Sequence, residues 1–331
     1  MSKHSNISVF VAHLGCPQQC SFCNQHYIAG TEALPQAEDI SNAVKTAVNS
    51  KNYDPKTTEL AFFGGSFTAI DRDYMLTLLE AAHQFVKSGE ICGIRISTRP
   101  DAIDDEILGT LKRCGVTAIE LGAQSMNDEV LNVNRRGHNA QAVRNAAALI
   151  KEYGFKLGLQ MMTGLYKDTP GKCVETAREF IKLGADCVRF YPTVIIKGTY
   201  LGELFEKGMY QSFSFDETID LCAELLEMFD RACIPVIRLG LHSGGDFDGS
   251  ILGGVYHPAL REITEGRMTF NKMKEFMERS GEKRFRVYTD RRNISRVSGH
   301  KKENKIKLGN LGYSFVITQE DGTDLRIEAV R

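Results

Sequence analysis

Three cysteines lie within eight residues near the start of the chain, with the spacing Cys16-x3-Cys20-x2-Cys23. Three thiolates can hold three irons of a 4Fe–4S cube and leave the fourth iron without a protein ligand. The short spacing suits such a cube, because the three ligands must surround it from a single loop. The open iron is then a position at which a substrate or cofactor can bind.

Other interpretations of these cysteines stay open at this point. Addition of His26 gives three Cys and one His, a set of donors that zinc also accepts. Cys20 and Cys23 form a Cys-x-x-Cys pair, which is typical of redox exchange, although such pairs usually open a helix in a smaller domain. The three thiols could also have no shared role.

The remaining six cysteines stand singly in apolar or helical runs, and we expect them to be reduced thiols that pack as small hydrophobes. They are Cys92, Cys114, Cys173, Cys187, Cys222 and Cys233. Because no even-numbered disulfide framework is present, a reducing, cytoplasmic location is expected. The N-terminal apolar run contains His13 and ends at the cysteines, so we predict no signal peptide. The chain has no apolar run of about 18 residues, so no membrane span is expected.

Apolar runs alternate with segments of helical period over most of the chain. Strands are predicted at 7–13, 59–65, 93–98, 117–122, 156–162, 187–192 and 235–241. Helices are predicted at 36–50, 72–87, 103–113, 140–152, 170–183 and 217–230. This alternation indicates an α/β fold in which a parallel sheet, covered by helices, curls into a partial (β/α)6 barrel.

A different pattern begins after about residue 245. A glycine-rich segment at 242–254 is interpreted as a hinge. It leads to a helical stretch at 258–279 and predicted strands at 284–289, 313–318 and 324–330. We therefore predict a barrel domain over 1–245 and a C-terminal α+β extension over 246–331.

Polar residues and glycines gather where the predicted strands end, namely Gly64, Gly65, Ser97, Gln124, Gln160 and Tyr191. Parallel sheets bind ligands at the carboxyl ends of their strands. The common placement of these residues predicts a ligand site along that edge.

Several motifs carry a family resemblance when read together with the cysteines. They are FFGGSF at 62–67, STRPD at 97–101, ELGAQS at 120–125, RRGH at 135–138, QMMTGL at 160–165 and YPTVIIKGT at 191–199. Over about residues 7–245 the chain resembles the radical S-adenosylmethionine (SAM) superfamily. It is most similar there to the core of the Elongator catalytic subunit and more loosely similar to oxygen-independent coproporphyrinogen oxidases.

The resemblance implies a 4Fe–4S cluster on Cys16, Cys20 and Cys23 and a SAM molecule bound to it. The glycine pair resembles the family's GGE motif, whose backbone contacts the SAM amino group, although Ser66 stands in place of the acid. Arg136 is expected to pair with the SAM carboxylate. The other expected contacts are Phe22 with adenine, Gly64 and Gly65 with the amino group, and Ser97, Gln124 and Gln160 with the ribose.

Two departures from the Elongator subunit affect the expected reaction. That subunit has a longer gap between its first two cluster cysteines, and an acetyltransferase domain follows its radical SAM core. This chain is expected to resemble the short bacterial Elongator-like proteins without that domain, so carboxymethylation of tRNA should not be assumed. An electron donor such as flavodoxin or ferredoxin is implied.

The charge of the chain is uneven. The net charge is −1, but residues 261–310 hold 15 Lys and Arg against 7 Asp and Glu, a net of +8. A phosphate-binding surface needs such an excess. Together with the resemblance to the Elongator subunit, this charge leads us to expect a radical SAM enzyme that acts on RNA, with tRNA as the partner. A radical SAM enzyme acting on a small molecule, and a zinc or iron–sulfur binding protein without enzymatic activity, remain alternatives.

Overall fold

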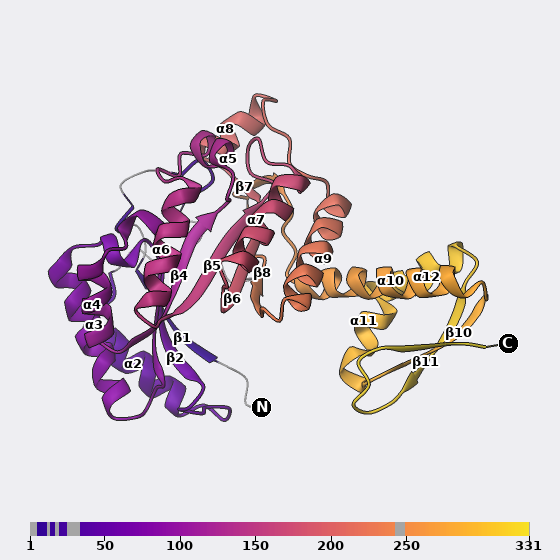
Figure 1. Cartoon of the computed structure of the whole chain (residues 1–331), viewed down its shortest axis with the longest axis horizontal. Helices are drawn as coiled ribbons and strands as arrows, with labels where there is room; N and C mark the ends of the chain where they lie inside the picture. Colours follow the sequence, from indigo (N-terminus) through magenta and orange to yellow (C-terminus); the bar gives the residue numbers. More distant parts are fainter. Residues whose placement is uncertain (1–4, 12–13, 17–19, 25–33, 242–248, 331) are drawn as a thin grey trace. The chain divides into compact units, whose positions relative to one another are not determined.

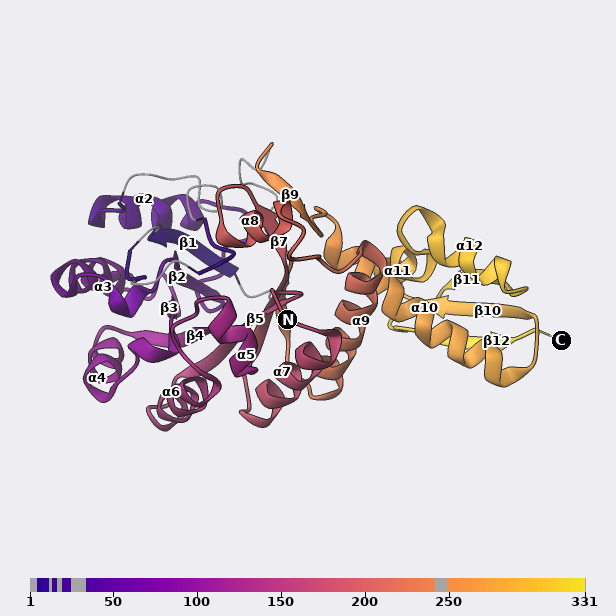
Figure 2. The ribbon, with the colours of Figure 1, turned by 90° about the horizontal axis from the view of Figure 1, so that it is seen from above.

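The computed structural model describes residues 5–11, 14–16, 20–24, 34–241 and 249–330. Its main element is a seven-stranded sheet of order β1-β2-β3-β4-β5-β6-β8. The strands are β1 (Ser5–Val11), β2 (Thr58–Gly64), β3 (Gly93–Thr98), β4 (Val116–Gln124), β5 (Lys156–Thr163), β6 (Cys187–Pro192) and β8 (Val236–Leu239). Neighbouring strands from β1 to β6 pair in parallel. Figures 1 and 2 show that the sheet is curled, as the predicted partial barrel requires.

The helices between the strands cover the outer face of the curled sheet (Figure 2). They are α2 (Ala37–Val48), α3 (Arg72–Lys87), α4 (Asp105–Arg113), α6 (Ala140–Glu152) and α7 (Pro170–Lys182). Leu60, Ile94 and Ile119 on the strands are fully buried, as are Leu78 on α3 and Leu111 on α4. Burial of this apolar layer supplies the main favourable free energy of the fold.

The opposite, inner face of the sheet carries polar and charged side chains. The register aligns Ala61 with Arg95 and Ser97 with Glu120. It also aligns Gln160 with Arg189. Because side chains alternate between the two faces of a strand, these residues share the inside of the curled sheet.

A second compact unit contains α9 (Phe215–Arg231) and the residues from Val255 onward. It includes α10 (Leu260–Ser280), α11 (Ile294–Ser298) and α12 (Glu303–Asn310). Its three-stranded sheet has the order β11-β10-β12, with β10 (Arg284–Thr289), β11 (Ser314–Gln319) and β12 (Arg326–Ala329). Met273, Met277 and Phe285 belong to a separate hydrophobic core in this unit.

The α/β partial-barrel prediction is confirmed, and the strand and helix bounds agree to within a few residues. The predicted hinge at 242–254 is partly wrong, because Ile251–Gly254 forms strand β9, which pairs antiparallel with β7 (Val194–Ile196). The part at 242–248 lies outside the described residues. The domain boundary after residue 245 stays a prediction. Among the described helices, none is long and apolar enough to cross a membrane.

Candidate cofactor site

The cysteine segment lies beyond the carboxyl end of β1. Cys20 is buried, at 7% exposure, whereas Cys16 is exposed and Cys23 is half-buried. The backbone N–H of Cys23 donates to the carbonyl of Cys20 at 3.2 Å. Among the described residues, no three Cys, His, Asp or Glu side chains converge on a point that would suit a single metal ion. Ligands of a cubic cluster bind three different irons, so they need not converge in that way.

The environment of the thiols opposes their charge in the absence of a bound cation. Burial raises the pKa of Cys23 to about 12, and the neighbouring Cys20 and Cys16 add to this shift. Burial also raises the pKa of Cys16, again with a contribution from Cys20. Thiolates in such surroundings need positive charge beside them, which bound iron and nearby guanidinium groups can supply. His26, the fourth donor of the zinc hypothesis, lies outside the described residues.

Arg136 provides one such guanidinium group. Its Nη1 donates to Cys20 Sγ at 3.0 Å, and its Nη2 donates to the carbonyl of Gly122, on β4, at 2.5 Å. The guanidinium carbon lies 6.0 Å from the centroid of the Phe22 ring. The third nitrogen, Nε, is buried and has no hydrogen-bond partner among the described residues. A buried unpaired cationic donor is costly, so this atom is suited to an anionic ligand.

A second guanidinium group, that of Arg99, contacts the backbone of Arg136. Arg99 pairs with Asp101 at 2.6 Å and also donates to the backbone carbonyl of Arg136 at 3.3 Å. The pKa of Arg99 is raised, chiefly by its hydrogen bond with Asp101. Its Nη1 is another buried nitrogen without a partner in the described part of the chain. Arg99 belongs to the STRPD motif, but the sequence alone indicated no role for it.

The glycine turn after β2 packs closely against the segment that leads to Cys16. The N–H of Gly65 donates to the Val11 carbonyl at 2.8 Å, and the N–H of Ser66 donates to the Leu14 carbonyl at 3.1 Å. A Cβ atom on Gly65 would lie 2.1 Å from the Leu14 carbonyl oxygen. Gly64 has φ +110°, which L side chains rarely adopt. Only glycine fits both positions, which explains the GG pair physically.

Ser66, which stands where the resembled motif has an acid, is almost fully buried. Its hydroxyl lies 2.9 Å from the Thr98 hydroxyl and accepts from the N–H of Arg99 at 3.2 Å. These bonds tie the glycine turn to the end of β3. Ser66 therefore has a structural role in this chain.

Asn134 is a residue that sequence reasoning missed. It is fully buried, and its Oδ1 accepts from the Ser21 hydroxyl at 2.6 Å. Its Nδ2 donates to the carbonyls of Val130 at 2.8 Å and Tyr166 at 2.9 Å. Asn134 thus anchors the cysteine segment to α5 (Asp128–Val133) and to the loop after β5. Its position directly before the RRGH motif was the available signal.

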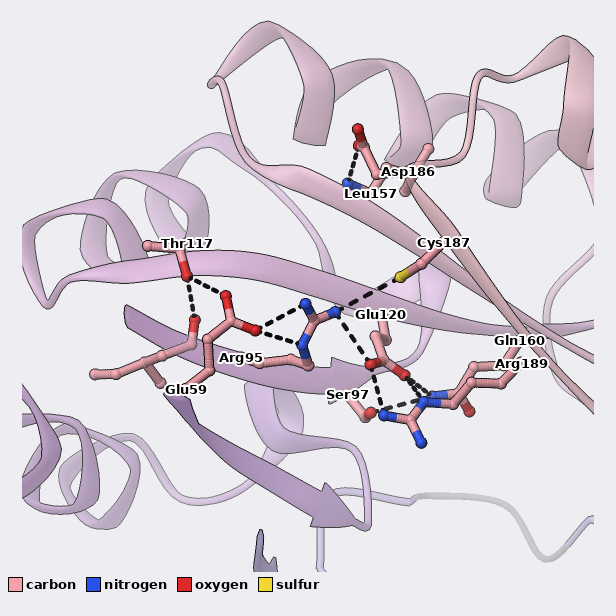
Figure 3. A network of polar contacts seen from close by, with 11 residues as sticks. Glu59, Arg95, Ser97, Thr117, Glu120, Leu157, Gln160, Asp186, Cys187 and Arg189 are labelled. Carbon is pink, nitrogen blue, oxygen red and sulfur yellow. Dashed lines mark hydrogen bonds and ion pairs between the residues drawn. The ribbon is translucent and has the colours of Figure 1, made fainter. Parts of the chain in front are cut away.

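The three residues predicted to face the ribose lie on adjacent strands. Gln160 Nε2, on β5, donates to Ser97 Oγ, on β3, at 3.1 Å. It also donates to Glu120 Oε2, on β4, at 2.8 Å (Figure 3). Gln124 ends β4 at a register shift and has φ +66°, a strained value for a residue with a side chain. Strain of this kind concentrates at functional sites.

The structure therefore joins the predicted residues in three local groups. Arg136 contacts Cys20 and lies near Phe22, Gln160 contacts Ser97, and the glycine turn contacts the segment before Cys16. Three thiols, two buried cationic nitrogens that have no partner in the described ranges, and a turn that excludes side chains fit an anionic iron–sulfur centre and an amino-acid carboxylate.

Comparison with known proteins agrees with this geometry. Residues 11–180 match the family model described as the Radical SAM superfamily, and residues 185–270 match the Radical_SAM C-terminal domain. Elongator complex protein 3 of Bos taurus is 32% identical over 231 residues, which are 63% of this chain and 41% of that protein. The tRNA uridine(34) acetyltransferase of Dehalococcoides mccartyi is 25% identical over 262 residues, 69% of this chain and 56% of that protein. The chain thus spans about half or less of these relatives.

Among solved structures, the Elp3 of the archaeon Methanocaldococcus infernus has a similar fold. The TM-score is 0.65 at 19% sequence identity, over 85% of this chain and 64% of that one. The family model alone covers more than half of the sequence. This chain belongs to the radical SAM superfamily, and part of its sequence is similar to Elongator complex protein 3.

Proposed function

We propose that this enzyme binds a 4Fe–4S cluster through Cys16, Cys20 and Cys23 and cleaves SAM with it. The observation that carries the proposal is Arg136, whose guanidinium group contacts Cys20 Sγ at 3.0 Å while its buried Nε lacks a partner among the described residues. A cation in that position can neutralise the cluster thiolates and still bind an incoming carboxylate.

When bound, a cluster of this type supplies the electron that splits SAM into methionine and a 5′-deoxyadenosyl radical. The chain's own residues bind and orient the SAM molecule. Arg136 pairs with its carboxylate, and the backbone of Gly64 and Gly65 binds its amino group. Phe22 lies against the adenine, and Ser97, Gln124 and Gln160 bind the ribose.

The first test is the metal content of protein purified without oxygen, which should hold about four irons and four sulfides per chain. Replacement of Cys16, Cys20 or Cys23 by Ala should abolish both. Cys92→Ser is the matched control, because Cys92 is exposed and lies apart from this site in the sequence. Stoichiometric zinc without labile sulfide would contradict the proposal.

The second test is SAM cleavage. Reduced, cluster-loaded protein should release 5′-deoxyadenosine and methionine, even slowly and without a second substrate. If the cluster-loaded protein releases neither product, the proposed cleavage of SAM is wrong.

We also propose that the substrate is tRNA and that the enzyme works in the cytoplasm with a flavodoxin or ferredoxin as electron donor. The support is the likeness to a tRNA uridine(34) acetyltransferase and the net charge of +8 over residues 261–310. Binding of tRNA that weakens as salt rises is the expected behaviour. If tRNA does not bind, small-molecule extracts become the source for the substrate search.

A further inference from the structure

A buried ion network crosses the inner face of the sheet (Figure 3). It consists of Glu59 on β2, Arg95 on β3, Glu120 on β4 and Arg189 on β6, each no more than 8% exposed. Arg95 bonds both acids, with Nη2 2.8 Å from Glu59 Oε2 and Nη1 3.2 Å from Glu120 Oε1. Burial of four charges costs much desolvation free energy, so the network is weak evidence for stability alone. The network is better explained by a role in positioning other groups.

Glu120 has no capacity left for a ligand. Its Oε1 accepts from Arg95 Nη1 at 3.2 Å and from Arg189 Nη2 at 3.1 Å. Its Oε2 accepts from Arg189 Nε at 2.6 Å and from Gln160 Nε2 at 2.8 Å. A carboxylate offers about four acceptor sites, and these four donors fill them. Glu120 can therefore influence a bound molecule only through one of its bonded neighbours. Of these, Gln160 is the residue proposed to contact SAM.

The contact with Glu120 fixes which way the Gln160 amide faces. An ionised carboxylate accepts hydrogen bonds but cannot donate them, so Gln160 must turn its NH2 group toward Glu120. The second N–H of that group donates to Ser97 Oγ at 3.1 Å. Both amide protons are then used, and among the described residues the carbonyl oxygen Oε1 of Gln160 has no partner. Ser97 accepts from Gln160, and its own hydroxyl proton has no acceptor in the described part of the chain.

We propose that Glu120 is a positioning residue for the ribose of SAM. It holds Gln160 so that the carbonyl oxygen accepts a hydrogen bond from one ribose hydroxyl, while Ser97 donates to a ribose oxygen. This inference rests on the proposed SAM binding, and it specifies which group donates and which accepts in each hydrogen bond. The guanidinium groups of Arg95 and Arg189 hold the Glu120 carboxylate in place.

The test is equilibrium binding of SAM to Glu120→Gln protein. A Gln at this position can donate from its own NH2 group. The Gln160 amide can then turn its carbonyl toward residue 120, and its hydrogen bond with the ribose is lost. Affinity for SAM should fall about tenfold. Affinity for a SAM analogue with a 2′,3′-dideoxyribose should be the same in the wild-type protein and the variant, because the lost bond is absent there already.

Glu59→Gln is the matched control. It removes the same charge from the same network. The contacts of Glu59 within the described residues include Arg95 and Thr117, whereas the Gln160 amide bonds Glu120. Thermal unfolding should show a comparable loss of stability in both variants, while only E120Q should lose affinity for SAM. If E120Q does not fold, Glu120→Asp replaces it. That side chain keeps the charge but is one methylene shorter, which draws the carboxylate away from Gln160.

The possible outcomes separate the two proposals. Equal loss of SAM affinity in E59Q and E120Q, or equal weakening of SAM and the dideoxy analogue, would show that the network is only structural and overturn this inference. Unchanged SAM affinity in E120Q, or in E120D where it replaces E120Q, would also overturn it. Lack of SAM binding by the cluster-loaded wild-type protein would instead overturn the proposed function, and this inference with it.

Discussion

Arg136 connects three parts of the candidate site, since it contacts Cys20, a proposed cluster ligand, and a β4 carbonyl, and lies near Phe22. We predict that Arg136→Ala weakens SAM binding by about 1.5–3 kcal/mol, because a carboxylate loses a charge-assisted partner. Arg135→Ala is the control. Arg135 is adjacent and exposed, and it stacks on the Tyr200 ring at 3.6 Å. Equal dissociation constants for the two variants, measured by equilibrium dialysis, would reject the role assigned to Arg136.

His138 makes the stability of the fold depend on pH. Burial, with the nearby charge of Arg136, lowers the pKa of His138 from 6.5 to about 4. Above about pH 6.5 the imidazole is neutral in both the folded and the unfolded chain. As pH falls from 6.5 to 4, the unfolded chain binds a proton that the folded chain does not, so the free energy of unfolding decreases by no more than about 3 kcal/mol.

The measurement is urea unfolding at pH 7 and pH 5 in the wild-type protein and in His138→Gln. The variant keeps a donor for the Ala123 carbonyl, which lies 3.3 Å from Nε2 of the histidine, but it does not titrate. Its unfolding free energy should change less between the two pH values. An identical change in both proteins would mean that His138 is not the group responsible.

For single residues, the sequence predicted candidate functional residues where they lie together in one motif. The cysteines and the RRGH motif were found because their residues are close together in the chain. The ion network was missed because its members come from four strands, and Glu59, Arg95 and Arg189 look like ordinary surface charges in the sequence. Glu120 lies within the ELGAQS motif, but its role depends on partners that only folding brings together.

Among the structural elements, the turn after β2 has no room for a side chain at Gly65. The Cβ atom of Gly65→Ala would lie 2.1 Å from the Leu14 carbonyl oxygen and 3.0 Å from that of Val11, so backbone must move. We predict a loss of at least about 1–3 kcal/mol in unfolding free energy. Cluster occupancy should fall with it, because Leu14 leads directly into the segment of Cys16.

Gly109→Ala is the contrasting variant. Gly109 lies inside α4, and the nearest atom to its added Cβ would be Arg113 Nη1 at 3.5 Å, an ordinary contact. Alanine is the better helix former, so stability should rise by about 0.5–1 kcal/mol with full cluster content. Denaturant unfolding and iron analysis of both variants measure the difference. Normal stability and iron content in G65A would contradict the described packing of the turn.

The elements that sequence reasoning located best are those with a clear hydrophobic period. The strand at 93–98 and the helices at 72–87 and 140–152 have the bounds predicted for them. Short elements were missed, such as α5 and α8 (Tyr200–Glu206). Strand β9 was mistaken for part of a hinge because its pairing with β7 joins residues more than 50 positions apart, which no local pattern reveals.

At the scale of the whole molecule, fewer cations of the basic stretch at 261–310 are available to bind phosphate than its composition suggests. Several of its cations are paired with acids of the same unit. Arg267 pairs with Asp216 on α9, Arg296 with Glu265, and Arg292 with Asp290. By contrast, an exposed set makes no ion pair within the described part of the chain: Arg284, Arg286, Arg291 and Lys301. These four residues are therefore better candidates for phosphate contacts than the stretch as a whole.

We predict that tRNA binding depends on this unpaired set. Each phosphate contact contributes about −0.7 to −0.9 to the slope of log affinity against log salt, so replacement of all four by Ala should flatten the slope by about 3 units. The control replaces four paired cations, namely Lys274, Arg279, Arg292 and Lys307. The net charge changes equally in both variants. Because the control residues already have acidic partners, the salt slope of the control variant should change less.

SAM cleavage should stay intact in both variants, because neither set belongs to the cofactor site. Equal flattening in the two variants would attribute binding to net charge alone, and a flat response in the wild-type protein would exclude this surface as the RNA contact.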